Sequence, residues 1–446
     1  MSERLSLKER ISYGCGDFGL CLTTTMVSTY LMYFYTNVVG IDLLKVGTIT
    51  LLGGIMDAIS DLVLGVMVDH TKSRWGKCRP YLLFMAVPLA VVVFFVFNVP
   101  DADPGVKYIY ALVTYLIYSW AYTAICIPYQ TLMASITDHQ GDRLSVSMWK
   151  TIGSSTGQFI INSLALTLVG VFGDGLVGFR TASLVFSGFG AILLLICFAN
   201  TRERIVPPKE QKVSVQDTIR AFNNGPWFIV CVSSLLTLTA VVLRAQQTMY
   251  YAQYVLGNLD VASILLTIST AVAIPVAIVT PQIALRLGKR NVVILGSALF
   301  IASSLVMWMA GQNTTLVCIS AVIAGIGSAM PNSVCYVMVA ETVDYGEWKQ
   351  GKRVQGGLMS FIAFGIKIGA SLAGMVSAMV LKAGGYVEQA MEQTPSAVQA
   401  VITNYIWLPV VMYVIIIVLQ MFYKLDKQYP QIKAELDQRR KEAAAQ

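Results

Sequence analysis

Two aspartates, Asp57 and Asp61, stand four residues apart inside an otherwise apolar stretch, residues 51–64. A carboxylate at the centre of a membrane costs about 2.5–3.5 kcal/mol on insertion scales. In a helix, a spacing of four residues places both carboxylates on one face, where two negative charges repel each other. A metal cation or a shared proton between them would remove that repulsion, so the pair predicts a cation site.

The elements that must position this pair are transmembrane helices. The chain has 446 residues, of which 56% are hydrophobic and 13% charged, whereas soluble domains average about 25% charged residues. Apolar runs of about 20 residues, each long enough to cross a bilayer as a helix, recur along the chain. We expect an all-α integral membrane protein with twelve spans, near residues 11–36, 44–68, 81–99, 107–135, 144–170, 180–200, 227–254, 261–285, 292–310, 315–340, 354–382 and 398–423.

The basic residues predict the orientation of these helices. With both termini in the cytoplasm, nearly all lysines and arginines outside the spans fall in cytoplasmic segments, and the opposite side holds only Lys45, Lys107, Arg180 and Lys382. This is the positive-inside pattern. It also accounts for the net charge of +7, so nucleic acid need not be invoked as a partner.

The longest polar interruption, residues 201–226, divides the chain almost evenly. We therefore predict a six-helix half at 1–200, a cytoplasmic linker, a second six-helix half at 227–423 and a cytoplasmic tail at 424–446. A basic glycine turn at residues 74–79 returns at 286–290, which suggests that the halves are repeats. Repeated halves are typical of transporters that bind substrate near the midplane.

The sequence Gly65-x-x-x-Asp69, followed by the basic turn, resembles the loop signature of the major facilitator superfamily. Further segments narrow the resemblance to the glycoside–pentoside–hexuronide:cation symporter family, and these are residues 13–17, 57–61, 73–80, 127–129 and 342–348. The resemblance implies the major facilitator fold, no enzymatic activity, and symport of a sugar with a cation by alternating access. We expect a functional monomer in a bacterial inner membrane, with both termini cytoplasmic.

The resemblance also implies which residues bind the cation. The family's helix-two aspartates match Asp57 and Asp61, the polar residue between them matches Ser60, and a helix-four threonine matches Thr123. These side chains offer oxygen atoms, which hard cations such as Na⁺ prefer. A proton would instead reside on one carboxyl group, whose pKa is raised by burial and by its neighbour. No other cofactor is expected.

At the matching sugar-site positions this chain departs from the family pattern. Aspartates on helices one and four become Cys21 and Cys126, and Tyr122 lies beside the second of these. Two tryptophans and an arginine are also replaced, whereas one lysine is kept; these positions are Gln130, Asn332, Lys150 and Lys367, respectively.

The lost carboxylates and the remaining cations favour an acidic sugar such as a glucuronide. Arg244 adds a third basic group within the predicted helices, and arginine can bind a carboxylate or sulfonate through two parallel hydrogen bonds. Alternatives stay open for each group. Arg244 could pair with an acidic residue or extend toward the interface, and Lys367 could be the counter-ion of the aspartate pair. Asp17 could pair within the cytoplasmic half rather than contact substrate.

Charged residues at the predicted cytoplasmic helix ends suggest an inner gate closed by salt bridges. They are Asp69, Arg74, Arg143, Asp344, Glu347 and Arg353. A solvated loop without a gating role is the alternative.

Other functional classes share some of these features. A uniporter or exporter of the same fold is one, although the costly aspartate pair argues against uniport. The sequence Gly14-Cys15-Gly16-Asp17 also matches the Gly-x-Gly-Asp motif of intramembrane aspartyl proteases, a signal of only four residues. A channel would need a re-entrant filter segment, which the sequence lacks.

Overall fold

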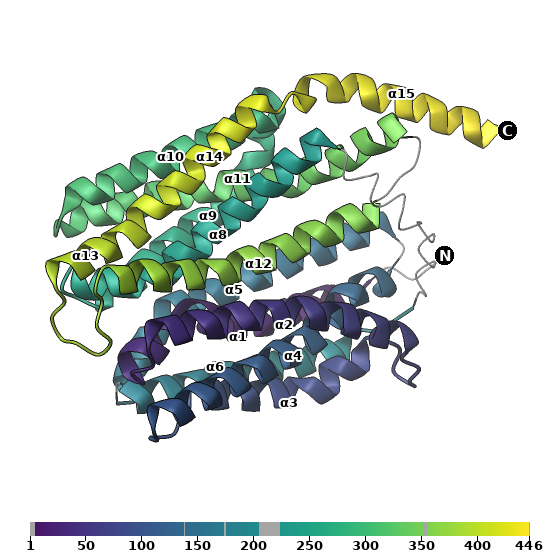
Figure 1. The fold of residues 1–446 in the computed structure, drawn as a ribbon. Coiled ribbons are helices and arrows are strands. Elements are labelled where there is room, and N and C mark those ends of the chain that lie inside the picture. The colour runs from purple at the N-terminus through teal and green to yellow at the C-terminus, as the bar shows by residue number, and fades with distance from the viewer. Residues whose placement is uncertain (1–4, 138, 174, 205–223, 351–354, 446) are drawn as a thin grey trace. The chain divides into compact units, whose positions relative to one another are not determined.

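The computed structural model describes residues 5–137, 139–173, 175–204, 224–350 and 355–445, and in these ranges the chain is helical without strands (Figure 1). The π-helical segments η1 (Phe34–Val38) and η2 (Thr403–Trp407) continue α1 and join α13 to α14. The α-helices are α1 (Leu7–Tyr33), α2 (Leu43–His70), α3 (Arg79–Val96), α4 (Pro104–Ile136), α5 (Gln140–Val171), α6 (Gly175–Asn200), α8 (Gly225–Tyr254), α9 (Asp260–Leu287), α10 (Lys289–Ala310), α11 (Thr314–Gln350), α12 (Gln355–Ala383), α13 (Pro395–Ile402), α14 (Leu408–Phe422) and α15 (Leu425–Ala445).

The all-α membrane fold predicted from the sequence is confirmed. Among the described residues, ten of the twelve predicted spans are helices long and apolar enough to cross a membrane. The other two predicted spans, 11–36 and 354–382, coincide with α1 and α12, which have 27 and 29 residues.

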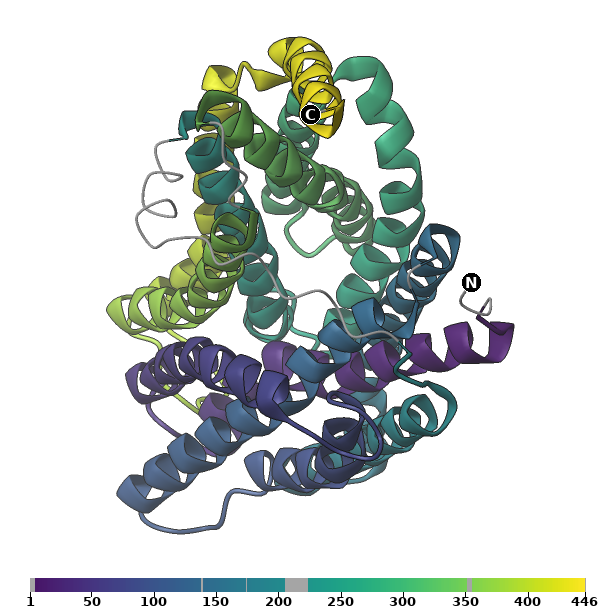
Figure 2. The same cartoon turned by 90° about the vertical axis from the view of Figure 1, so that its right-hand side faces the viewer.

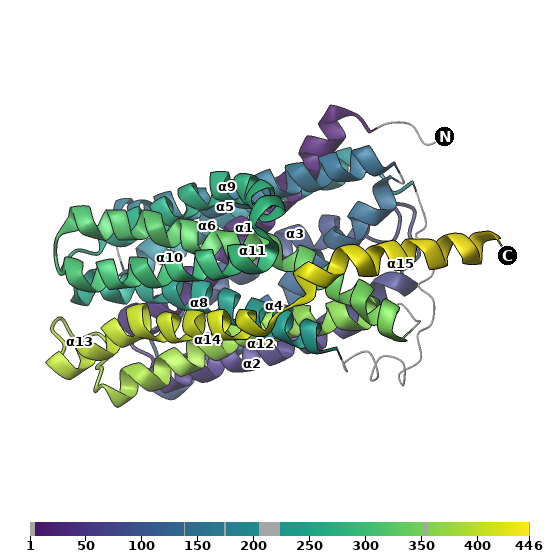
Figure 3. The ribbon, with the colours of Figure 1, turned by 90° about the horizontal axis from the view of Figure 1, so that it is seen from above.

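Two helices extend beyond what hydropathy predicts. α11 continues ten residues past the predicted end at residue 340, and the predicted tail contains α15, which follows α14 after a short break (Figure 3). Hydropathy reports where apolar surface ends, whereas a helix continues as long as its residues favour helical geometry. Of the predicted linker 201–226, residues 205–223 lie outside the described ranges.

The chain forms two compact units. Unit 1 comprises residues 1–209, 245–270 and 374–401, and unit 2 comprises 210–244, 271–373 and 402–446. In unit 1, α1 packs against α5 and α6, and α4 packs against α2 and α3 (Figure 1 and Figure 2). In unit 2, α10 packs against α11 and α14, where the rings of Phe300 and Tyr413 stack with centroids 4.1 Å apart.

Side chains at the helix starts explain several boundaries. The Ser6 hydroxyl accepts a hydrogen bond from the Glu9 backbone N–H, and the Asp42 carboxylate accepts from the N–H groups of Leu44 and Lys45. Such N-caps satisfy N–H groups that have no partner inside the helix. α3 and α4 instead begin with a proline in the first turn, where its missing N–H costs nothing.

Candidate functional site

The predicted cation residues of α2 and α4 lie against one another in unit 1. The Thr123 hydroxyl donates a hydrogen bond to Asp57 Oδ1 at 2.6 Å, and Ser60 Oγ lies 3.1 Å from Thr123 Oγ1. Ser119, which the sequence did not single out, approaches the same carboxylate oxygen at 3.5 Å. Asp61 lies one turn along α2 and is half-buried. The carboxylate and hydroxyl oxygens gathered here fit a hard cation.

The predicted substrate residues of the first six helices also gather in unit 1. Cys126 on α4 accepts a hydrogen bond from Gln130 Nε2 at 3.2 Å. Cys21 on α1 lies within electrostatic range of Cys126 and of Lys150 on α5. Tyr122, one turn before Cys126, lies within electrostatic range of both thiols. Three helices therefore contribute to this group of polar residues.

Asp17 on α1 belongs to the same group. Lys150 lies within electrostatic range of its carboxylate, and Ser154 lies within hydrogen-bonding reach of it, both from α5. Asp17 thus lies near a basic and a hydroxyl side chain of the same unit. The sequence-based charge balance did not include this acidic group beside Lys150.

Glycines bring α1 and α5 close enough for these contacts. A Cβ atom on Gly153 of α5 would lie 2.1 Å from the backbone oxygen of Gly14, and a Cβ on Gly157 would lie 2.9 Å from the Cβ of Cys21. Only glycine permits such an approach of two backbones at both positions. The close crossing holds Cys21 and Lys150 in one group.

In unit 2 the Arg244 guanidinium is held between two aromatic rings. It lies 4.8 Å from the ring centroid of Phe300 on α10 and 4.9 Å from that of Tyr405 in η2. This cation–π arrangement was not among the roles considered for Arg244 from the sequence. Lys367 is half-buried on α12, and Asn332 is exposed on α11.

Three of the six predicted gate residues have partners within their own units. Arg74 lies over the ring of Trp75 at 4.1 Å, and Arg143 Nε donates to the Thr137 backbone oxygen at 2.8 Å. Asp344 accepts a hydrogen bond from the Tyr429 hydroxyl of α15 at 2.8 Å. Glu347 lies half-buried on α11, whereas the side chain of Asp69 and all of Arg353 lie outside the described residues.

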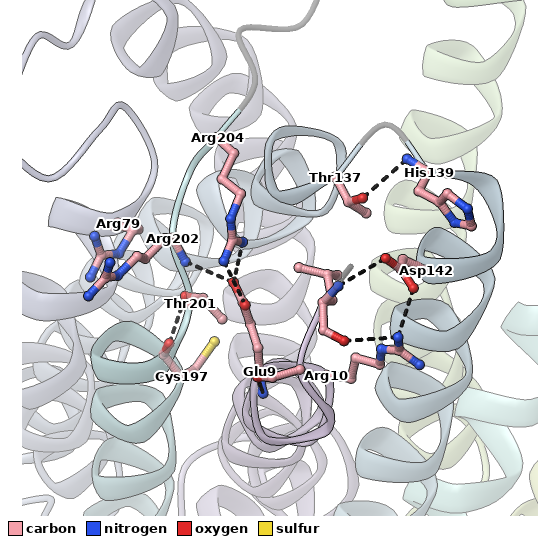
Figure 4. Close-up of polar contacts among 12 residues, drawn as sticks. Glu9, Arg10, Arg79, Thr137, His139, Asp142, Cys197, Thr201, Arg202 and Arg204 are labelled. Carbon is pink, nitrogen blue, oxygen red and sulfur yellow. Dashed lines mark hydrogen bonds and ion pairs between the residues drawn. The ribbon is translucent and has the colours of Figure 1, made fainter. Parts of the chain in front are cut away.

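The sequence reasoning missed two buried carboxylates at one end of unit 1. Glu9 accepts a bidentate pair of hydrogen bonds from Arg204, at 2.7 and 3.0 Å (Figure 4). Asp142 accepts from Arg10 at 2.8 Å and from the Leu5 backbone N–H at 3.0 Å. These pairs tie α1 to the segment after α6 and to α5. They join residues more than 130 positions apart, so no local pattern reveals them.

Glu203 is a third carboxylate whose contacts the local sequence does not reveal. Its carboxylate accepts hydrogen bonds from the backbone N–H groups of Lys77, Cys78 and Arg79, at 2.8, 2.7 and 3.0 Å. These N–H groups form the turn that leads into α3, where Gly76 adopts a φ of +103°. A carboxylate at a helix N-terminus is favoured by its hydrogen bonds and by the helix dipole.

The equivalent turn in unit 2 is built in the same way. Gly288 has a φ of +84°, and the Arg290 backbone N–H donates to Asp426 at 2.7 Å. The guanidinium groups of Arg79 and Arg290 also bind the backbone oxygens of Phe198 and Met421, at 2.9 and 3.1 Å. The turns at 74–79 and 286–290, which the sequence suggested were repeats, therefore share their bonding pattern.

Glu203→Ala is expected to lower the stability of the folded protein by about 2 kcal/mol, because three backbone N–H groups lose a charged acceptor. Thermal unfolding of the detergent-purified protein measures the effect. Glu203→Gln, which keeps an acceptor oxygen, is the control and should lose less. An unchanged unfolding midpoint in Glu203→Ala would show that water replaces the carboxylate without cost.

Comparison with known proteins places this geometry in a family. A family model described as MFS/sugar transport protein matches residues 12–427. The isoprimeverose transporter of Lactiplantibacillus pentosus is 35% identical over 97% of this chain and 91% of its own length. A glucuronide carrier protein homolog of Escherichia coli is 30% identical over 99% and 98%. A crystal structure of a D-xylose-proton symporter shares the fold, with a TM-score of 0.67 at 13% identity over 95% and 98% of the chains.

These matches cover nearly the whole chain, and they agree with the motifs from the first helix to the eleventh. The all-helical fold with apolar spans is the architecture that the family requires. This chain therefore belongs to the major facilitator superfamily sugar transporters, within the glycoside–pentoside–hexuronide:cation symporter family.

Proposed function

We propose that this cation-coupled sugar symporter carries a sugar or glycoside with an acidic group, together with Na⁺ or H⁺. In this proposal it acts as a monomer in a bacterial inner membrane, with both termini in the cytoplasm, and it needs no cofactor besides the coupling ion. The observation that carries the proposal is that α4 contributes to both groups of residues in unit 1. Thr123 contacts Asp57, and Cys126, three residues later, belongs to the substrate group.

A shared helix gives coupling a physical basis. The cation, as cargo, takes oxygen ligands from Asp57, Ser60, Asp61 and Thr123, and the Thr123 hydroxyl then reorients away from the Asp57 carboxylate that it now contacts. A small adjustment of α4 at Thr123 is transmitted to Cys126 one turn away. If the cation raises the affinity for sugar, linkage requires that sugar raises the affinity for the cation by the same factor.

Alternating access then completes the cycle. With both cation and sugar bound, one of the two negative charges of the aspartate pair is compensated, and the two halves exchange between conformations that face opposite sides. A uniporter would have no use for the pair, which is costly in an apolar helix. The protease alternative is wrong, because the family and the structural neighbours are transporters.

The substrate class rests on this chain's own charges, since the relatives are named for several different sugars. Lys150 lies near Asp17, and Arg244 and Lys367 of unit 2 are two further basic groups. The rings of Phe300 and Tyr405 hold the Arg244 guanidinium in place. A fixed, planar cation suits a carboxylate or sulfonate.

Uptake of a glycoside panel, with and without sodium and at two pH values, tests the proposal. We expect flux of an aryl glucuronide to exceed that of the matching aryl galactoside by about tenfold or more, because a charge-assisted hydrogen bond is lost with the neutral sugar. Stimulation by sodium at both pH values would identify Na⁺, and stimulation by external acid without sodium would identify H⁺. Strong galactoside flux without uronide flux would contradict the acidic-substrate proposal.

A further inference from the structure

A polar cluster in unit 1 joins the ends of α1 and α8 to the segment after α12. The Asn37 amide of η1 donates to Gln253 at 3.2 Å and to the Tyr254 hydroxyl at 2.9 Å. Its oxygen accepts from the Tyr386 hydroxyl at 2.8 Å, and Tyr33 donates to Gln253 at 2.6 Å. Asn37 thus connects helices from the first and the second six spans. We call these five residues the Asn37 cluster.

A charged group, the Asp42 clasp, lies nearby at the start of α2 and consists of Asp42, Lys382 and Glu388. Lys382 Nζ lies 2.7 Å from Asp42 and 3.5 Å from Glu388, and Glu388 also accepts from the Leu43 backbone N–H at 2.9 Å. Partial burial raises the pKa of Asp42, but Lys382 and two backbone N–H groups outweigh it and hold the pKa below its usual value. The Asp42 carboxylate therefore stays charged at neutral pH.

Small residues let α2 and α12 come into close contact beyond the Asp42 clasp. A Cβ on Gly47 would lie 2.9 Å from the Cβ of Ala378, and a Cβ on Gly374 would lie 2.6 Å from Thr50 Oγ1. Close contact through small residues brings the helices together without interlocking large side chains. Such a surface can separate and close again without repacking a core.

The side of the membrane follows from the charge pattern. Asp42 and Lys382 lie at helix ends, and Glu388 lies in the loop after α12, on the side that the positive-inside rule predicts to be external. Their hydrogen bonds are between polar groups, and Asp42 and Lys382 are exposed by 37% and 40%. Water can therefore replace each partner when the contact opens. The contacts of the clasp and of the Asn37 cluster can therefore close this end of the helices and also break reversibly.

We propose that the Asn37 cluster and the Asp42 clasp form the external gate of the transporter. The gate is closed in this structure, where α1 and α2 contact the ends of α8 and α12, and it opens when these segments separate. The inference rests on the transport cycle proposed above, but it assigns the gate to residues outside the cation and substrate groups. It complements the charged helix ends that the sequence suggested for an inner gate.

Cross-linking tests the gate directly. In an Asp42→Cys/Lys382→Cys variant, a bifunctional thiol reagent that a reductant can cleave should join α2 to α12 and hold the gate closed. We expect sugar uptake to fall about tenfold or more and to return after reduction, because the outward-facing state can no longer be populated. The treated wild type and the two single variants report any reaction at the native cysteines.

A matched control is available on the same predicted side. Arg180 donates to Asn98 at 3.4 Å, and this contact joins α6 to the end of α3 within the first six spans. An Asn98→Cys/Arg180→Cys variant, cross-linked with the same reagent, should keep its uptake. If the first pair is poorly expressed, Asn37→Cys/Tyr386→Cys cross-links η1, at the end of α1, to the segment after α12 and tests the same gate.

Three outcomes would overturn the proposal. These are full uptake by the cross-linked gate pair, no cross-link in a well-expressed gate pair, or an equal loss of uptake in the control pair. Absence of uptake before any reagent is added would instead contradict the transport function. The two failures are therefore distinguishable.

Discussion

Asp57→Asn is expected to abolish uphill accumulation of sugar, so that the internal concentration rises only to about the external one. The asparagine keeps the size of the side chain and an oxygen that can accept a hydrogen bond from Thr123. In the wild type, Thr123 Oγ1 lies 2.6 Å from Asp57 Oδ1. The substitution removes the negatively charged carboxylate, which a hard cation prefers as a ligand. Uptake against a gradient, measured in energised cells or vesicles, reports the loss.

Two further measurements separate loss of coupling from loss of folding. Sugar counterflow, which needs no net cation movement, should persist in Asp57→Asn if the protein is folded. Asp101→Asn, which removes a fully exposed carboxylate elsewhere in unit 1, should accumulate sugar as the wild type does. Undiminished accumulation in Asp57→Asn would overturn the cation-site assignment and the mechanism built on it.

Gly153→Ala is expected to be the most damaging single-methyl change in unit 1. The new Cβ would lie 2.1 Å from the backbone oxygen of Gly14, and backbone cannot move aside as a flexible side chain can. Overpacking a tight contact costs about 1–3 kcal/mol, and here it also pushes α1 away from α5. The fraction of monodisperse protein extracted from membranes measures the effect.

Gly188→Ala on α6 is the control, because nothing lies within 4 Å of a Cβ at that position. It should be extracted as well as the wild type. Equal yields of the Gly153→Ala and Gly188→Ala proteins would show that the α1–α5 crossing adjusts freely. The substrate group, which depends on that crossing, would then have no fixed geometry.

The helices could be predicted from the sequence because each apolar run of membrane-spanning length marks a segment that crosses the bilayer as a helix. α11 and α15 show where this signal ends. Residues 341–350 and the tail are helical but polar, so hydropathy carries no information about them. Their geometry depends on contacts such as that between Asp344 and Tyr429, which join residues 85 positions apart.

The residues of the candidate site also fall into those that the sequence predicted and those that it did not. Asp57 was identified because a carboxylate is costly in an apolar helix, and Ser60 and Thr123 were identified through a motif resemblance. The structure brings the three side chains together. Ser119 was missed because a serine in an apolar helix is a common residue. The neighbours of Asp17 were not predicted, because Lys150 and Ser154 come from another helix. Residues recognised by type were found, and those defined by long-range contacts were not.

The carboxylates that complete the two basic turns have a consequence for the order of folding during synthesis. Glu203 lies 125 residues after the Cys78 N–H group that it binds, so the turn before α3 waits about 6–25 s for its acceptor at ordinary elongation rates. Asp426 follows Arg290 by 136 residues, so the turn before α10 waits about as long for its acceptor. Each basic turn thus receives its carboxylate from the segment made just after the six helices that contain the turn. A pause in synthesis soon after residue 203 therefore gives the turn before α3 time to form before the second half is made.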